Sequence, residues 1–270
     1  MQKLVLQSSS LFHQVTTEFV LFWRNRQTLY LAFLVPMLGM ALFVYLNREG
    51  LLERVFGAMF RVLGKEGAML DSVSPMTLMT LGLTVYCVID VAFESAVPKM
   101  VHERSTGIHK RLGGTPLRGW VFLAGKSLSA TVIVAIEVAL ILAVGLISAD
   151  ITIAGSWWLL GLILLLGTLT TAALGFVLSN VMASADGAVV AVHAIYIPML
   201  FLCGAFVPVE ALPRLLQAMA RIVPLTYFVS PFRSVMVQGA DLGAIAGELS
   251  ILLAWTVATW IAAVKTFRWQ

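Results

Sequence analysis

The chain has 270 residues, of which 60% are hydrophobic and only 12% are charged, and its mean hydropathy is +0.93. A soluble domain needs more polar surface than this composition supplies, so the sequence predicts an all-α integral membrane protein with one membrane domain, residues 1–270. The formal net charge of +4 is modest. We interpret it as an orientation signal that also contacts lipid head groups, and it gives no indication of nucleic-acid binding.

The N-terminal residues 10–26 place apolar side chains at helical spacing, with polar side chains elsewhere around the helix. This pattern predicts a helix at the membrane interface, with Ser10 as its N-cap and Trp23 at the level of the lipid head groups. An ordinary membrane anchor is the simplest interpretation of this helix.

Six apolar runs follow, each long enough for the roughly 20 residues that cross a bilayer. They comprise residues 28–46, 73–97, 120–147, 157–178, 188–207 and 245–264. The sequence therefore predicts six transmembrane helices. The alternative has five, with the fifth run re-entrant. Residues 51–65, between the first two runs, have the pattern of an amphipathic helix that lies on the outer leaflet.

The loop at residues 98–119 is the most basic of the chain, with Lys99, Arg104, Lys110, Arg111 and Arg118. Because cytoplasmic segments of membrane proteins are rich in Lys and Arg, we expect this loop in the cytoplasm. Six spans then place both chain ends on the same side of a cytoplasmic (inner) membrane. In this topology eleven of the 18 Lys and Arg residues are cytoplasmic.

Three carboxylates lie within the apolar runs, where each costs about 2.5 to 3.5 kcal/mol on insertion scales. Asp90 and Glu94 are four residues apart and share one helix face, so we expect a hydrated entrance or a pairing with the basic loop. Glu137 lies near the middle of the third run. It either lines a polar substrate pathway or is protonated.

Two short sequences resemble functional motifs but lack a residue that the motif requires. The sequence GKS at 125–127 suggests a phosphate-binding loop, but that motif requires a glycine where residue 120 is tryptophan. The pair His102 and Glu103 would begin a zinc-protease motif only if residue 106 were histidine, and it is threonine. We therefore expect no metal site, no nucleotide site and no enzymatic activity in this chain.

Two stretches resemble the type-2 permeases of ABC exporters. The first is ERSTG at 103–107 followed by GTPLR at 114–118, and the second is GAFVP at 204–208, LP at 212–213 and PLTY at 224–227. The resemblance implies a subunit that exports an amphipathic or lipophilic substrate, such as a drug, an antibiotic, a lipid or a glycan. Its partners would be a second permease, identical or related, and separate cytoplasmic ATPase subunits that bind ATP and Mg.

In this family the loop at 98–119 carries a short coupling helix that contacts the ATPase. The resemblance assigns ATPase coupling to Glu103, Gly107, Thr115, Pro116 and Leu117. The residue types support such a helix without the resemblance. Gly107 and the glycine pair at 113–114 can form turns, and Pro116 can start the next helix. The sequence therefore predicts a short rigid piece between these turns.

The resemblance also implies that residues 204–233 dip back toward the membrane from outside. Four prolines, at positions 208, 213, 224 and 231, are expected to divide the segment into short pieces. An apolar cap of this kind can gate an exit. The residues that we assign to such an outer gate are Phe206, Pro208, Leu212, Pro213, Pro224, Tyr227 and Arg233.

Two other functional classes remain open from the sequence. The first is an ion-coupled secondary transporter that uses Asp90, Glu94 and Glu137. The second is a membrane scaffold that recruits partners through its basic loop and transports nothing.

Overall fold

The computed structural model describes residues 2–62, 74–94, 96–148 and 151–269, and within them all regular structure is helical. Its elements, in chain order, are α1 Gln2–Arg24, α2 Arg26–Arg48, α3 Leu51–Val62, α4 Pro75–Ile89, the π-helix η1 Asp90–Glu94, α5 Ala96–Ser105, α6 Ile108–Gly113, α7 Gly119–Ser148, α8 Trp157–Val181, α9 Ala185–Leu202, the 3-10 helix η2 Val209–Ala211, α10 Arg214–Ala220, α11 Thr226–Gln238 and α12 Leu242–Thr266.

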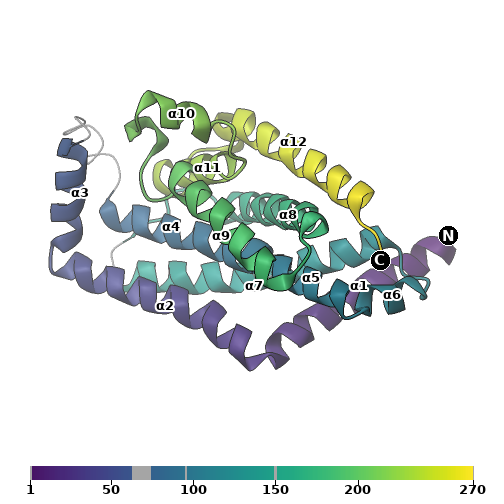
Figure 1. Cartoon of the computed structure of the whole chain (residues 1–270). Coiled ribbons are helices and arrows are strands. Elements are labelled where there is room, and N and C mark those ends of the chain that lie inside the picture. Colours follow the sequence, from purple (N-terminus) through teal and green to yellow (C-terminus); the bar gives the residue numbers. More distant parts are fainter. Residues whose placement is uncertain (1, 63–73, 95, 149–150, 270) are drawn as a thin grey trace.

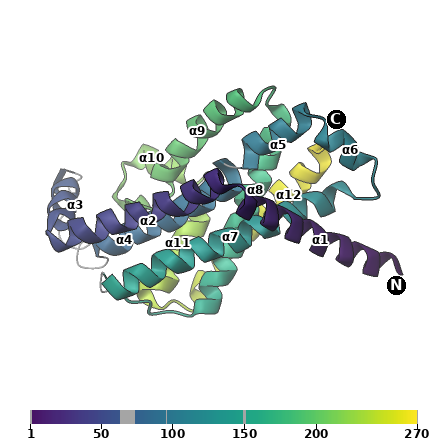
Figure 2. The same cartoon turned by 90° about the horizontal axis from the view of Figure 1, so that it is seen from below.

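The described residues contain six helical stretches long and apolar enough to cross a membrane, which confirms the predicted spans. These are Thr28–Arg48, Pro75–Ser105, Gly119–Ser148, Trp157–Val181, Ala185–Leu202 and Leu242–Thr266, of which the second includes residue 95, outside the described residues. Both chain ends lie at the same end of the molecule as α6, whereas α3 lies at the opposite end (Figures 1 and 2). This arrangement is the one expected for an even number of spans.

Helix α8 is the centre of the bundle, because α12, α7, α5 and α11 all pack against it. Small residues recur at every fourth position of α8, and this strip is buried at Gly167, Thr171, Gly175 and Ser179. A side chain at Gly167 would collide with the ring of Phe228 on α11. Small residues thus let the neighbouring helices approach α8 closely.

The remaining spans are covered unequally within the chain. The corresponding small residues of α12, at 246, 250, 254 and 258, are exposed. Helix α9 buries only Ala188 and Val192. These surfaces are left for lipid or for another protein.

Three local predictions were wrong. Helix α1 begins at Gln2, so Ser10 lies inside it and is not an N-cap; residues 2–9 contain no glycine or proline that would stop the helix. Pro116 was expected to start the next helix, but α7 begins at Gly119, three residues later. Pro231 does not break its segment but lies within α11, where the buried rings of Phe228 and Phe232 hold the helix together.

Candidate functional site

The short helix α6 forms the tip of the basic loop, and the local sequence explains its limits. Gly107 precedes it in the left-handed conformation, with φ of 75°, which favours glycine. After its last turn, the Thr115 hydroxyl donates a hydrogen bond of 2.6 Å to the carbonyl oxygen of Leu112. The predicted short piece between glycine turns is therefore present as a helix.

His109 attaches α6 to the body of the protein. Its side chain is buried at 2% exposure, and its ring makes edge-on contacts with Phe122 of α7, Phe267 and Trp269, at centroid distances of 5.5, 5.8 and 6.5 Å. Phe267 and Trp269 follow α12. His109 thus joins the tip of the loop to α7 and to the C-terminal segment.

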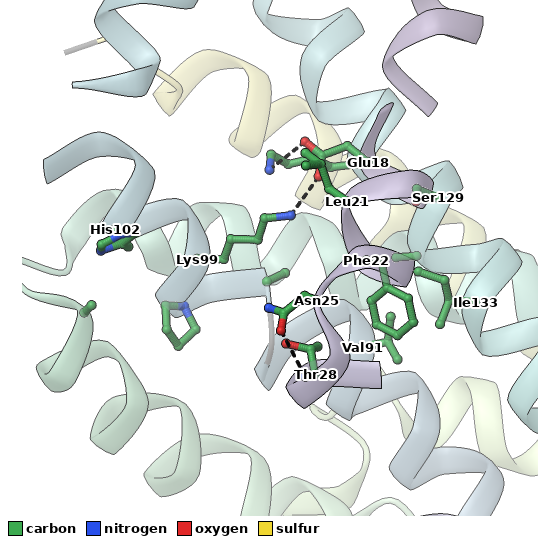
Figure 3. A pocket seen from close by; sticks show the side chains of 15 residues that line it. Glu18, Leu21, Phe22, Asn25, Thr28, Val91, Lys99, His102, Ser129 and Ile133 are labelled. Atoms are coloured by element: carbon green, nitrogen blue, oxygen red, sulfur yellow. Dashed lines mark hydrogen bonds and ion pairs between the residues drawn. The ribbon is translucent and has the colours of Figure 1, made fainter. Parts of the chain in front are cut away.

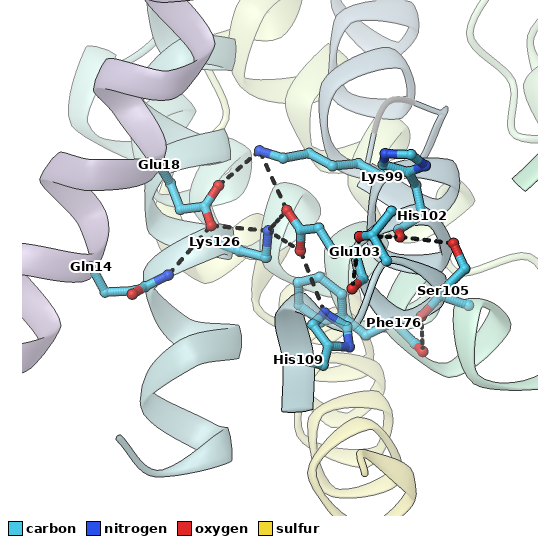
Figure 4. Close-up of polar contacts among 11 residues, drawn as sticks. Gln14, Glu18, Lys99, His102, Glu103, Ser105, His109, Lys126 and Phe176 are labelled. Atoms are coloured by element: carbon cyan, nitrogen blue, oxygen red, sulfur yellow. Dashed lines mark hydrogen bonds and ion pairs between the residues drawn. The ribbon is translucent and has the colours of Figure 1, made fainter. Parts of the chain in front are cut away.

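The imidazole of His109 also reaches a network of charged side chains, drawn in Figure 4. Its Nε2 atom lies 3.4 Å from Oε2 of Glu103 on α5. The ammonium group of Lys126 on α7 lies 3.0 Å from both carboxylate oxygens of Glu103 and 2.9 Å from Oε1 of Glu18 on α1. Lys99 on α5 lies 2.9 Å from Oε2 of Glu18 and 4.0 Å from Oε1 of Glu103.

The network combines two carboxylates with two ammonium groups, and three of the four side chains are largely buried. The side chains of Lys126, Glu18 and Glu103 are 8, 9 and 12% exposed, whereas Lys99 is 44% exposed. Removing one member would leave an opposite charge buried without its partner, which costs about 3 to 5 kcal/mol. The network is therefore a stiff connection between α1, α5, α6 and α7.

The pKa of Glu18 reflects this environment. Burial alone would raise it, but the ammonium groups of Lys126 and Lys99 outweigh burial and hold the pKa of Glu18 below its ordinary value of 4.5. Glu18 is therefore a carboxylate at neutral pH, which is the form that attracts both lysines.

Gly125 and Arg104 bring further elements to the site. A side chain at Gly125 on α7 would lie 2.3 Å from Cγ of Gln14 on α1, so glycine lets these two helices approach. Arg104 on α5 donates hydrogen bonds to the carbonyl oxygens of Ser179, at 3.0 Å, and Met182. It therefore satisfies carbonyl groups at the C-terminal end of α8, where a positive charge also suits the helix dipole.

The residues predicted to couple to an ATPase differ in their surroundings. Glu103 points inward into the network, whereas Thr115 and Pro116 are exposed. Leu117 is partly buried and, like Phe267, packs against the buried cluster that includes Phe122. The exposed surface of the loop tip includes Ile108, 39% exposed, together with Lys110 and Arg111.

Sequence reasoning missed the roles of Glu18, His109 and Lys126, which lie far apart in the chain. One signal was present: Lys126 lies just inside an apolar run, and a charge in that position is expected to have a partner. No group of three or more His, Cys, Asp or Glu side chains that could hold a metal ion occurs among the described residues.

At the opposite end, the segment 204–233 is divided into η2, α10 and the start of α11, as Pro208, Pro213 and Pro224 predict. Pro208 and Pro224 are buried, Phe206, Leu212 and Tyr227 are partly buried, and Pro213 is exposed. Arg233 lies 3.4 Å from a carboxylate oxygen of Glu210. The residues assigned to the outer gate therefore belong to one packed cap.

The carboxylates within the spans lie on two facing helices. Glu137 on α7 is 1% exposed, and neither of its carboxylate oxygens has a hydrogen-bond partner among the described residues. Asp90 begins η1 and is partly buried. The side chain of Glu94 lies outside the described residues.

Comparison with known proteins identifies the family. A family model described as ABC-2 type transporter matches residues 10–237. The chain is 26% identical over 191 residues to "Probable multidrug ABC transporter permease YbhR" of two Escherichia coli strains, K12 and O157:H7, which covers 71% of this chain and 50% of the relative.

The chain is also 27% identical over 151 residues to "Putative transport permease YvfS" of Bacillus subtilis (strain 168), covering 56% of this chain and 61% of the relative. It therefore spans about half the length of the YbhR relatives and three-fifths of YvfS. The family model matches far more than half of the chain, and its residues include both the basic loop and the outer cap. The chain belongs to the ABC-2 type transporter family and is a multi-pass membrane permease.

Proposed function

We propose that this permease is the membrane subunit of an ATP-driven exporter that moves an amphipathic or lipophilic substrate out of the cytoplasm. Separate ATPase subunits bind ATP and Mg, and a second permease, identical or related, completes the membrane part. The name of the YbhR relatives, "Probable multidrug ABC transporter permease", supports a drug-like substrate at 26% identity. The basic loop and both chain ends face the cytoplasm, in accord with the distribution of Lys and Arg.

The observation that carries this proposal is the construction of α6. Its inner side is fixed by His109, while Ile108, Lys110 and Arg111 remain exposed. A short helix with a fixed inner side and an exposed outer side can receive a push from a partner without being deformed. The exposed basic side chains Lys110 and Arg111 favour a partner surface with acidic groups.

Movement of α6 would reach the membrane by a short path. His109 contacts Glu103, and Glu103 contacts Lys126 at the start of the span α7. Lys126 in turn binds Glu18, so α1 moves with α7. At the other end of the molecule, the cap formed by residues 204–233 serves as the outer gate.

Co-purification with a candidate ATPase, followed by ATP-dependent transport in membrane vesicles, tests the proposal. Ile108→Glu introduces a charge into the exposed face of α6 without disturbing the buried network, so we expect loss of ATPase binding and of transport. Leu51→Glu is the matched control, because Leu51 is likewise 39% exposed and lies on α3 at the opposite end, outside the outer cap. Normal binding and transport in the Ile108→Glu variant would contradict the assignment of α6.

Altering Glu103 or Leu117 tests the inner side of the same connection. Glu103→Gln and Leu117→Ala should both transport less substrate for each ATP hydrolysed. Because loss of the Glu103 carboxylate also lowers stability, transport is compared at equal amounts of folded permease. Transport that proceeds without ATP and depends on an ion gradient would instead identify a secondary transporter. Tight ATPase binding without any transport would identify a scaffold.

A further inference from the structure

A pocket of about 680 Å³ opens beside the charge network, between α1, α2, α5 and α7. Ligand pockets commonly have volumes of about 300 to 1,000 Å³, so it has room for a small amphiphile or for part of a lipid. Figure 3 shows Lys99 reaching from α5 toward Glu18 on α1, with Phe22, Val91 and Ile133 grouped beyond it. The pocket therefore has a polar part and an apolar part.

The charge of the polar part is unbalanced. The ammonium groups of Lys99 and Lys126 both line the pocket, but Glu18 is the only carboxylate among the lining residues. Glu103, which balances the second lysine, lies behind this lining. The network as a whole is balanced, with two lysines and two glutamates, but both of its ammonium groups and only one of its carboxylates border the pocket. An occupant therefore meets more positive than negative groups at close range, which favours an anion.

Lys99 is the cation that an occupant can reach. Its side chain is 44% exposed, compared with 8% for Lys126. An ammonium group has three hydrogen-bond donors, and Lys99 has one close carboxylate contact, at 2.9 Å to Glu18, with Glu103 more distant at 4.0 Å. Lys99 can therefore bind a further anion without first losing Glu18.

Asn25 supplies a second donor to the same space. Its side-chain oxygen accepts a hydrogen bond from the backbone N–H of Thr28, at 3.3 Å. Its amide NH2 has no acceptor among the described residues, and both Asn25 and Thr28 line the pocket. A phosphate or carboxylate offers several acceptor oxygens, which suits a site that combines an ammonium group with an amide.

We propose that this pocket binds an amphiphile with an anionic head group, placing the head group at Lys99 and Asn25 and the apolar part against Phe22, Val91 and Ile133. Helix α1, the predicted interfacial helix, forms part of the lining, which would place the pocket within reach of membrane lipid. Basic pockets between transmembrane helices are known to hold acidic lipid head groups. The site lies on α1, α2, η1, α5 and α7 rather than on the exposed face of α6.

The binding test uses the purified permease in a neutral detergent, titrated with phosphatidylglycerol or with phosphatidylcholine of the same acyl chains. Native mass spectrometry counts the bound lipid. We expect phosphatidylglycerol to bind about tenfold more tightly, since a hydrogen bond to a charged group contributes about that factor. Equal affinities for the two lipids would overturn the proposal.

Three substitutions sharpen the test. Lys99→Gln should weaken phosphatidylglycerol binding about tenfold, whereas Lys110→Gln, on the exposed face of α6, should leave it unchanged. Glu18→Gln should strengthen binding, because it removes the internal carboxylate that competes for Lys99. If Lys99→Gln disturbs folding, the double variant Glu18→Gln/Lys99→Gln removes the pair together and must still bind weakly. Unchanged binding in the Lys99→Gln variant, or weaker binding in Glu18→Gln, would refute the site.

A second arm distinguishes a resident lipid from an exported one, and only this arm rests on the proposed function. Labelled phosphatidylglycerol is followed in proteoliposomes that contain the permease and its ATPase. ATP-dependent movement between leaflets would mark the bound lipid as cargo. Binding without movement would mark it as a resident lipid, and either outcome supports the site itself.

Discussion

The contact between Gly167 on α8 and Phe228 on α11 makes a quantitative prediction about bundle packing. An alanine Cβ at position 167 would lie 2.4 Å from Cδ2 of Phe228. Non-bonded carbon atoms pack best at about 3.5 to 4.0 Å, so the methyl group is more than about 1 Å too close. Phe228 is fully buried and packs against Phe232 at a centroid distance of 5.6 Å. The ring therefore has little room to move, and we expect overpacking to cost about 1 to 3 kcal/mol.

Gly161→Ala is the matched control for Gly167→Ala. Gly161 lies on the same helix, is exposed, and has no atom within 4 Å of an added Cβ. Both variants gain the same helix preference of about 1 kcal/mol, so their difference isolates the clash. Thermal unfolding in one detergent should give Gly167→Ala the lower Tm, by about 2 to 4 °C for each kcal/mol. Equal Tm values would refute the argument that α11 packs tightly on α8.

Three other predictions concern buried polar groups. His109→Ala should lower stability by about 2 to 3 kcal/mol, because it empties an aromatic site, while the exposed Lys110→Ala should change it by less than about 0.5 kcal/mol; similar Tm values would contradict the anchoring of α6. The lowered pKa of Glu18 means that its stabilising effect is present at neutral pH and is lost as pH falls below its ordinary value of 4.5; the Tm difference between wild type and Glu18→Gln should therefore shrink on acidification, and a constant difference would argue against the ion pairs. Glu137→Gln keeps the size of the buried side chain but cannot gain or lose a proton, so a proton-carrying role predicts that the variant loses the pH dependence of transport; transport unchanged at every pH would exclude Glu137 as a proton carrier.

The membrane architecture could be predicted because it depends on local patterns. A long apolar run must form a helix in lipid, since every backbone polar group needs a partner within its own segment. Gly107 marked the start of α6 for a similarly local reason, its positive φ. Pro231 was mispredicted because α11 continues through it, and the buried rings of Phe228 and Phe232 on either side supply tertiary contacts that favour the helix.

The charge network could not be predicted in the same way. Glu18 lies 81 positions before Lys99, and no periodicity within either helix indicates that they meet. The sequence alone also does not indicate that Glu103 faces the protein interior while Ile108 is exposed. What the sequence did indicate was the type of group required, because a lysine at the start of an apolar run needs a carboxylate partner.

The sparse internal contacts of α9 have a practical consequence for handling the protein. Since α9 buries only Ala188 and Val192, most of its packing partners must come from the surrounding lipid, detergent or protein. We expect its backbone amides to exchange with deuterium sooner than those of α8, whose environment is the protein interior. The choice of detergent should therefore alter deuterium exchange in α9 strongly and exchange in α8 little. The order of α9 in a purified sample then depends on the detergent used.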